Sequence, residues 1–512
     1  MPKSLDQLRR DAKALAKRYE ALDPQAHALM QPIAARRGAA PLKHADFLQA
    51  IANANGFASW PKLVWASETI GLDRAAKQQR LKVALYHGQN WRVEQLLADT
   101  PDLADGAFDL EVALLRRDAV EAALAEEPSL ATRDFGVRRP IVILAFSKYI
   151  HAQPELEADM LAIADTLVAH GADANDGYAD PNADGHLLSA LYGAIGHANN
   201  MALGRWLLEH GADPNDGESL YHATELGHHD GLKMLLDHGA DPAGTNALLR
   251  AMDFHDVEAV RLLLAAGAHV EDFNADEVGG EKPLVTAALH QAARRMSPMP
   301  MVQLLVENGA DLSRVHDGVT PYAMARIFGN SDLATVLEAR GADHPLTPVE
   351  AQLAAVADGA DPVGFINSAR LPEAARNIVR LILHLPGKLP HVKRLVEAGA
   401  EWDRPDDMGL PPVQIAGWEG LPDVMGYFLS LGPDLSRVNN YGGTLLGTII
   451  HGSENNPDRA KRDHITCARL ALEEGVALPR RAPELAGEPN MAAFLADWAE
   501  AHPGQVVESG VV

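Results

Sequence analysis

The chain repeats one arrangement of apolar and polar positions. An amphipathic run ends on an apolar pair, and a glycine, an alanine and an acidic residue follow, as in Leu207–Asp213. The recurring glycines lie 28 to 58 positions apart, with Gly211 to Gly239 and Gly239 to Gly267 the shortest steps and Gly341 to Gly399 the longest. A period of about 20 to 50 residues is typical of a solenoid, a propeller or a repeat array. Further copies end at Gly171, Gly267 and Gly309.

The stretch 317–341 predicts the structure of one unit. Asp317 and Gly318 indicate a tight turn. Thr320 can accept a hydrogen bond from an exposed helix amide, and Pro321 stands where no amide hydrogen is needed, so a helix is expected to begin there. A second apolar stripe ends at Gly341, because glycine readily adopts the left-handed conformation that closes a helix. The unit is therefore turn, helix, turn, helix, and the predicted class is all-α.

The pattern along the chain predicts four segments. Residues 1–70 lack the repeat and are expected to form a helical head, which acts as a cap. Residues 78–343 are a first repeat stack, with polar excursions at 176–182 and 271–282 and a helix over 187–196. Residues 346–500 are a second stack that ends in a capping helix, and its start is marked by a helix N-cap at Thr347. Residues 503–512 are expected to be a frayed tail.

Several stretches resemble ankyrin repeats. They are Gly227–Asp230 with Leu235–Pro242, Val319–Pro321 and Gly211–Gly217, and the resemblance covers about residues 78–475. The start of the first helix departs from the family pattern in most units, and Ser219–His222 matches it in part. The resemblance implies an all-α solenoid that binds a protein on its concave face. The head, with Gly56–Trp60, is similar to that of many bacterial ankyrin-repeat proteins, which implies a bacterial source.

Charge narrows the class of partner. The 512 residues carry 70 acids against 45 lysines and arginines, a formal net charge of −25. This argues against nucleic acid, which requires a basic surface. It suits a basic protein partner, although acidity also keeps a long array soluble. The head is basic, with Arg9, Arg10, Lys13 and Lys17. Its basic side chains are either a docking patch for an acidic partner or, as we favour, the solvated face of a cap.

The sequence also indicates where the protein acts. No apolar leader follows Met1 and no run approaches 18 apolar residues, so we expect neither a signal peptide nor a membrane helix. Cys467 is the one cysteine, which allows no disulfide within the chain and favours a reducing compartment. We therefore expect a cytoplasmic protein, and secretion by a signal-independent route stays open. The oligomeric state is open as well.

The chain has 22 histidines, but they do not follow a metal-binding motif. Most stand before the glycine or in the turns of a unit, where we expect them to bond backbone and link neighbouring units. No nucleophile elbow or phosphate-binding loop occurs. His451, Ser453, Asp463 and His464 resemble a triad, yet an insertion capped by polar side chains is the favoured interpretation. We predict no catalytic residue, metal or cofactor.

Exposed aromatic and arginine side chains are common hot spots of protein interfaces. We therefore predict partner-binding residues on the variable turns and beside them, with plain surface packing as the alternative. These residues are Tyr178, Asp180, Asn182, Tyr221, Trp402, Arg404, Trp418, Asn439 and Tyr441. Trp206 is assigned to the core.

The predicted function is non-catalytic protein recognition. Two alternatives are kept. One is an effector that a bacterium delivers into a host cell, and the other is an enzyme built on the repeat scaffold. The enzyme would use a pocket between residues 176–186 and 272–282, or one near His451.

Overall fold

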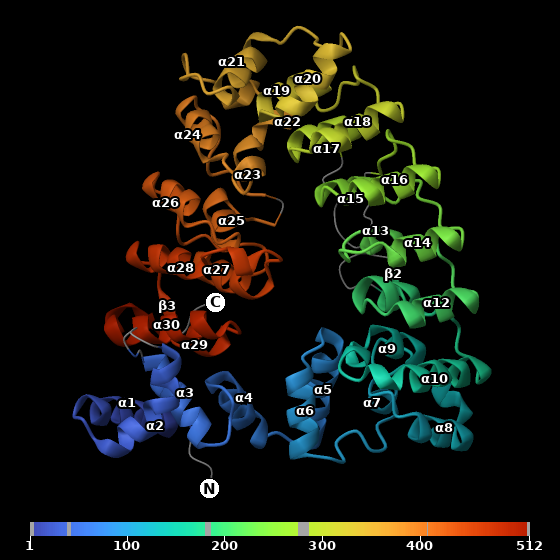
Figure 1. Ribbon diagram of the computed structural model, residues 1–512, viewed down its shortest axis with the longest axis vertical. Helices are drawn as coiled ribbons and strands as arrows, with labels where there is room; N and C mark the ends of the chain where they lie inside the picture. The colour runs from blue at the N-terminus through green and yellow to red at the C-terminus, as the bar shows by residue number, and fades with distance from the viewer. Residues whose placement is uncertain are drawn as a thin grey trace. The chain divides into compact units, whose positions relative to one another are not determined.

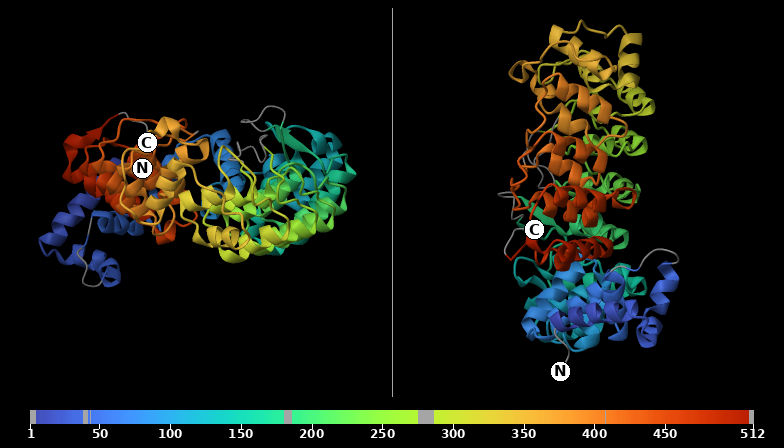
Figure 2. Two further views of the ribbon diagram at one scale, coloured as in Figure 1. Left: turned by 90° about the horizontal axis from the view of Figure 1, so that it is seen from above. Right: turned by 90° about the vertical axis from the view of Figure 1, so that its left-hand side faces the viewer.

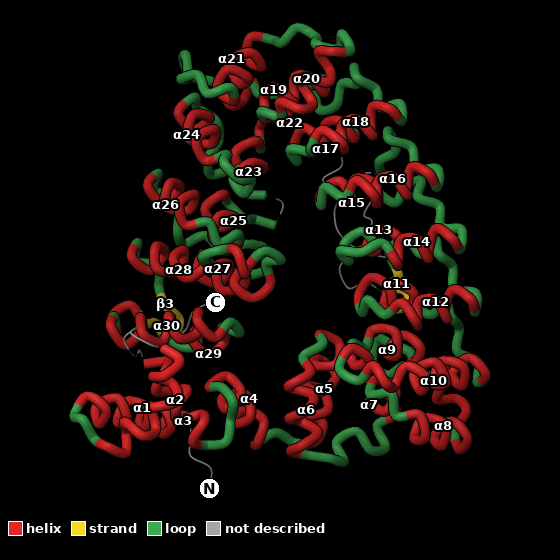
Figure 3. The backbone as a smooth tube through the Cα atoms, viewed as in Figure 1, coloured by secondary structure: helices red, strands yellow, loops and turns green. Residues whose placement is uncertain are grey.

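The computed structural model describes residues 5–37, 42, 44–179, 186–274, 286–406 and 408–508. Helices make up nearly all of its regular structure, which confirms the all-α prediction (Figure 3). The chain divides into two compact units (Figure 1). We call residues 72–350 the middle unit, and residues 1–71 together with 351–512 the terminal unit. Among the described residues, no helix is long and apolar enough to span a bilayer.

The middle unit is a series of helix pairs. Its α-helices are α5 Arg74–His87, α6 Asn90–Asp99, α7 Phe108–Ala113, α8 Arg117–Glu126, α9 Pro140–Phe146, α10 Glu157–Ala169, α11 Ala190–Tyr192, α12 Met201–Glu209, α13 Ser219–Ala223, α14 Asp230–Asp237, α15 Ala247–Asp253, α16 Val257–Ala265, α17 Ala288–Arg294, α18 Met299–Glu307, α19 Pro321–Phe328 and α20 Ser331–Ala339. Short 3₁₀ turns add η1 Pro128–Thr132, η2 Tyr149–His151 and η3 Pro154–Leu156.

The pairs stack so that like helices lie side by side. The first helices form one row, in which α7, α9, α11, α13, α15, α17 and α19 contact one another in turn (Figures 1 and 2). The second helices α8, α10, α12 and α14 form another row, and α16, α18 and α20 likewise follow each other. Each helix pair buries its apolar stripe mainly against the neighbouring helix pairs, as expected of a solenoid.

Local caps explain the helix boundaries. The Thr320 hydroxyl accepts the Ala323 amide at 3.1 Å, and Pro321 follows as predicted. Gly329 ends α19 in the left-handed conformation, with φ of 71°. The Asn330 side chain then caps α20 at the Leu333 amide, 3.1 Å away. Each such cap contributes on the order of 1 kcal/mol, and together they keep the helices short.

The acid that follows glycine and alanine is a turn residue. The Asp213 carboxylate accepts the Asn215 amide at 2.9 Å. The backbone amide of Asp213 donates in turn to Asn175 Oδ1 of the preceding loop, at 2.8 Å. Asn215 Oδ1 accepts the Asp241 amide in the same manner, at 2.7 Å. Consecutive loops are thus joined by side-chain-to-backbone bonds, which are worth about 1 kcal/mol each.

The predicted helix over 187–196 is wrong at its start. β1 (Gly177–Ala179) and β2 (Leu187–Ser189) form an antiparallel pair, with Tyr178 opposite Leu188. The helical part begins at α11 and continues as a π-helical turn, η4 (Gly193–His197). The strand pair satisfies backbone groups of these two segments that an open chain would leave to water.

The terminal unit contains the head and the C-terminal helices. Its helices and strands are α1 Leu5–Glu20, α2 Pro24–Arg37, α3 His44–Ala54, α4 Trp60–Ile70, η5 Ser368–Arg370, α22 Glu373–Arg376, α23 Ile378–Ile382, α24 Leu389–Glu397, α25 Pro412–Trp418, α26 Pro422–Ser430, α27 Leu445–Asn455, η6 Arg459–Lys461, α28 His464–Glu473, β3 Leu478–Pro479, α29 Ala482–Leu485, α30 Pro489–Ala501, η7 Pro503–Gln505 and β4 Val506–Val507. The helix α21 (Pro348–Ala357) crosses the division between the two units.

The predicted start of α21 is confirmed as a capping box. Thr347 Oγ1 accepts the Glu350 amide at 3.3 Å, and Glu350 Oε2 accepts the Thr347 amide at 2.7 Å. The two side chains satisfy each other's exposed backbone donors. Pro348 fills the next position, where the helix has no partner for an amide hydrogen.

The head belongs with the end of the chain. Its core includes Leu8, Met30, Ile33 and Phe47. Helix α3 contacts α30, and Lys13 forms a 3.2 Å ion pair with Glu500. Both partners of that pair are about half exposed, so it contributes little, and the contact between the helices is the main link. The repeat pattern gave no sign of this contact.

The predicted frayed tail is wrong through residue 508. β4 pairs in parallel with β3, placing Val506 beside Leu478. Gln505 Nε2 donates to the carbonyls of Leu472 and Val476, each at 2.7 Å. These bonds anchor the segment beyond α30. Residues 509–512 lie outside the described residues.

Candidate protein-binding surfaces

Tyr178 is buried among aromatic rings. The Arg138 guanidinium carbon lies 4.4 Å from the Tyr178 ring centroid and 4.6 Å from that of Tyr86. Arg138 also donates to the Tyr178 hydroxyl at 3.0 Å. The expectation that Tyr178 lies on an exposed loop is therefore corrected, because its ring and hydroxyl are used inside the middle unit. Asp180 and Asn182 lie outside the described residues.

The same cluster continues along the first helices. Phe146 packs edge-on against Tyr178 and Tyr192, with centroids 5.4 and 5.7 Å away. His197 Nε2 lies 2.9 Å from the Tyr86 carbonyl, and burial lowers the pKa of His197 to about 4. Its imidazole is thus neutral at pH 7 and donates to that carbonyl. The cluster ties the first helices of separate units together.

Tyr221 is also buried, beside a network of charged groups. The His222 ring lies between two carboxylates, with Nε2 3.1 Å from Glu218 and Nδ1 2.9 Å from Glu225. Glu218 is fully buried and contacts His186 as well. Burial favours a lower pKa for His222, but the hydrogen bonds to Glu218 and Glu225 outweigh it and raise the pKa to about 9. The His222 imidazole is therefore charged at pH 7.

The network extends across three first helices. Glu225 accepts from Arg250 at 2.7 Å, and Asp253 accepts from Arg295 at 2.7 Å. Arg250 and Asp253 lie 3.4 Å apart, which joins the two pairs. We call His222, Glu225, Arg250, Asp253 and Arg295 the ion-pair ladder. Its charges neutralise one another within the row, so few of them are left for a partner.

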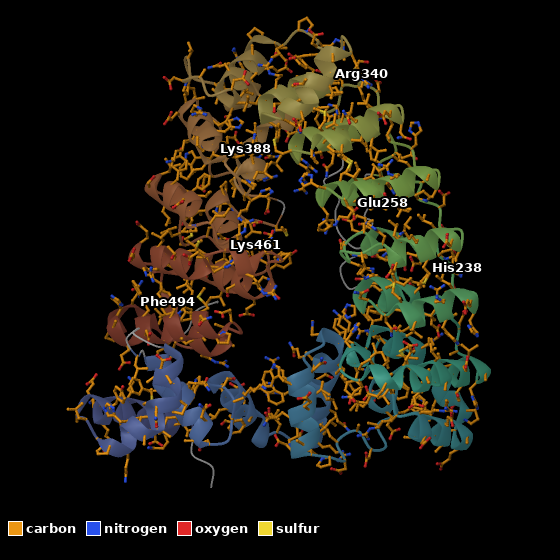
Figure 4. All side chains as sticks on the ribbon, viewed as in Figure 1. His238, Glu258, Arg340, Lys388, Lys461 and Phe494 are labelled. Atoms are coloured by element: carbon orange, nitrogen blue, oxygen red, sulfur yellow. The ribbon has the colours of Figure 1, made fainter. Side chains whose placement is uncertain are left out.

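The histidines before the glycines act within their own helices. His170 Nδ1, His210 Nδ1 and His238 Nδ1 each lie 2.7 to 2.8 Å from the carbonyl four residues earlier (Figure 4 labels His238). The expected links between units come instead from turn histidines, since His228 Nε2 lies 2.9 Å from Asn199 Oδ1. Within the described part of the chain, no group of three or more His, Cys, Asp or Glu side chains has a geometry that could hold a metal.

Trp402 and Arg404 lie on the loop after α24 in the terminal unit. Trp402 is half-buried. Arg404 lies 3.5 Å from Glu373 of α22 and 3.8 Å from Glu401 of its own loop. The guanidinium therefore holds this loop against a helix. Its charge is already balanced by two carboxylates, so the guanidinium is less able to attract a partner.

Trp418, Asn439 and Tyr441 have different roles. The Trp418 carbonyl accepts a hydrogen bond from His464 Nε2 at 2.9 Å, and the ring is half-buried. Asn439 Oδ1 accepts the amides of Tyr441 and Gly443 at 3.0 and 2.9 Å, so Asn439 shapes its turn. Tyr441 is 79% exposed. Of the predicted residues that the structure describes, Tyr441 is the most accessible to a partner.

The triad-like residues do not assemble. The Ser453 hydroxyl donates to the Ile450 carbonyl at 2.6 Å. Asp463 caps α28 at the Thr466 amide, 2.9 Å away. His464 bonds Trp418, and His451 Nδ1 lies 3.0 Å from Asn455 Nδ2. Each group has a structural partner, as the favoured interpretation expected. The other hypothesised pocket depends on residues 180–185 and 275–285, which lie outside the described residues.

Comparison with known families decides the nature of the array. A family model described as "Ankyrin repeats (3 copies)" matches residues 191–274, from α11 to the loop after α16. The chain contains ankyrin repeats. The structure adds the stacked helix pairs that such repeats require, and the predicted all-α solenoid is confirmed.

Individual relatives match parts of the chain. Protein phosphatase 1 regulatory subunit 27, from Homo sapiens and from Mus musculus, is 41% identical over 58 residues. The match spans 11% of this chain and 38% of each relative. Among solved structures, the ankyrin repeat domain of Bcl-3 matches 45% of this chain and 98% of its own, with 22% identity and a TM-score of 0.33.

The partner-binding residues predicted from the sequence do not include the two most exposed apolar side chains. Val363 and Phe365 are 84% and 81% exposed, and both stand on the loop after α21. Met408 and Val438 are about half exposed, on the next two long loops. The available signal was the apolar pair that flanks Gly364, directly after Asp361 and Pro362.

Proposed function

We propose that the protein is a non-catalytic scaffold that binds a protein partner through its loops and first helices. The stacked rows of helix pairs are the main support for this proposal. They align the variable loops of successive helix pairs along one side of each compact unit. The matched relative is named as a regulatory subunit of a protein phosphatase, a role exerted through another protein. That name supports the class of function and goes no further.

The proposed partner is a basic protein. The chain carries a net charge of −25, and an acidic surface raises the association rate of cationic partners. Nucleic acid and anionic membranes are disfavoured on the same physical ground, since both present negative charge. We propose the cytoplasm as the place of action, in keeping with the single cysteine.

Cross-linking to captured partners tests the proposal. The intact protein is immobilised, partners from an extract of its source are captured and cross-linked, and the modified residues are mapped. We expect cross-links on the loops and first helices, and reduced capture by the Tyr441→Ala protein. Capture of nothing, or cross-links confined to second helices such as α14 and α16, would contradict the proposal.

A further inference from the structure

Three consecutive loops of the terminal unit expose large apolar side chains. The loops are 359–367, 399–411 and 432–444. We call their exposed apolar residues the loop stripe: Val363, Phe365, Met408, Val438 and Tyr441. Single exposed apolar residues are ordinary on a protein surface, whereas several on adjoining segments mark an interaction site.

Backbone contacts hold these loops next to one another. The Ile366 amide donates to the Ala398 carbonyl at 2.7 Å, which fixes the first loop to the base of the second. A Cβ placed on Gly399 would lie 2.6 Å from the Phe365 ring, so the ring lies directly over that glycine. The Asn440 amide donates to the Met408 carbonyl at 2.9 Å and joins the second loop to the third. The loop stripe is therefore one surface.

The surroundings of the loop stripe are acidic. The described residues of the three loops include five acids and two arginines: Asp361, Glu401, Asp403, Asp406 and Asp434, against Arg404 and Arg437. Arg404 is balanced by Glu401 and by Glu373 of α22. Asp361 is exposed and makes no ion pair with a described residue.

Asp403 adds to this excess. It is half-buried, and burial raises its pKa. The charge of Arg437 lowers that pKa, and the charge of Asp434 raises it by a smaller amount. A cation from outside the chain would stabilise the charged form of the Asp403 carboxylate, which burial disfavours. Lys or Arg on a partner therefore complements the rim, while a phosphate or an anionic headgroup would be repelled.

We propose that the loop stripe binds a protein segment in which large apolar side chains are interspersed with lysine or arginine. The apolar side chains cover Phe365 and Tyr441, and the cations meet Asp361 and Asp403. This deepens the proposed scaffold function and rests on it, because it assigns one binding surface and the chemistry of the segment that occupies it.

A random library of 16-residue peptides, displayed on phage and panned against the intact protein, provides the probe. We expect the enriched peptides to combine aromatic or aliphatic residues with lysine or arginine. An enriched peptide is then synthesised and titrated against the Phe365→Ser, Tyr441→Ser double variant, whose exposed positions tolerate the change. Binding is expected to weaken at least about tenfold, the size typical of losing two interface anchors.

Two matched variants separate this surface from others. Val137→Ser with Val315→Ser removes apolar side chains of similar exposure from loops of the middle unit, and it is expected to leave the affinity unchanged. Asp361→Asn with Asp403→Asn should weaken binding and flatten its salt dependence. Its control, Glu209→Gln with Asp237→Asn, removes two exposed charges from α12 and α14 and should do neither.

The outcomes distinguish the two proposals. If the library enriches peptides whose binding ignores Phe365 and Tyr441, or enriches acidic peptides, the loop-stripe proposal fails while the scaffold function stands. If panning and cross-linking both yield nothing, the scaffold function itself fails. If sedimentation shows that the intact protein forms dimers that the double variant abolishes, the loop stripe binds a second copy, and the proposal for a cationic segment is overturned.

Discussion

The first-helix row of the middle unit and the loops of the terminal unit contain similar residues in opposite situations. In the middle unit, Arg138 stacks on Tyr178 and donates to its hydroxyl. Arg250 lies over the Tyr221 ring and forms an ion pair with Glu225. In the terminal unit, Phe365 and Tyr441 face solvent. Residue type alone therefore does not identify an interface. What matters is whether the surrounding chain already satisfies the side chain.

The largest difference in stability between the two regions should come from removing a carboxylate in each. Glu218→Gln removes a fully buried charge shared by His186 and His222. We expect a loss of about 3 kcal/mol in the free energy of unfolding, because a buried cation loses its partner. Glu373→Gln removes a half-exposed carboxylate from Arg376 and Arg404 and should cost less than about 1 kcal/mol. Urea unfolding of both variants, with hydrogen exchange to locate the change, gives the comparison.

Raising the pH should weaken the middle unit. The pKa of His222 is about 9 in the folded protein, against about 6.5 in an unfolded chain. Because the folded pKa is raised, the stabilisation is fully present below pH 6.5 and is lost as the pH rises through 9. The loss should be on the order of 3 kcal/mol. Hydrogen exchange of α13 and α15 between pH 6.5 and 9.5 measures it, and His222→Gln should remove the pH dependence.

Lowering the pH should affect both units. Burial lowers the pKa of His197 and His290 to about 4 in the middle unit, and that of His391 to about 3 in the terminal unit. Folding keeps these rings neutral, so stability falls as the pH drops from 6.5 toward those values. Chemical unfolding at pH 7, 6 and 5 should show a steady decrease of about 1 kcal/mol or more. A stability that is flat over this range would contradict the assignment of neutral buried rings.

The smallest expected changes in stability are those of Asn439→Ala and Tyr441→Ala, on one loop of the terminal unit. Asn439→Ala removes the acceptor for two backbone amides, and we expect a loss of about 1 kcal/mol. Tyr441→Ala should change stability by less than about 0.5 kcal/mol, because the side chain is exposed. Thermal unfolding of the two variants checks the order. A larger loss for Tyr441→Ala would show that the ring is structural, and it would weaken the argument for the loop stripe.

The regular units could be predicted from the sequence because local rules determine them. The helix start at Thr320, the capping box at Thr347 and the glycine ends follow from backbone chemistry within a few residues. The strand pair of Tyr178 with Leu188, the burial of Tyr178 beneath Arg138 and the contact of α3 with α30 depend on partners distant in sequence. A periodic pattern does not carry that information.

The candidate surfaces were predicted less well for the same reason. Aromatic residues on turns were selected by type, and the fold buried Tyr178 and Tyr221 while exposing Tyr441. Val363 and Phe365 were not among the predicted residues. Their exposure arises from the way loop 359–367 is held against Ala398 and Gly399, which only the folded chain reveals.

The contact between α3 and α30 has a consequence for synthesis. The head leaves the ribosome before its partner helix, which is translated more than 400 residues later, since α3 ends at Ala54 and α30 begins at Pro489. At about 5 to 20 residues per second, the face of α3 that meets α30 waits for tens of seconds. During that interval the middle unit can fold on its own. The terminal unit is completed only when the last helix arrives.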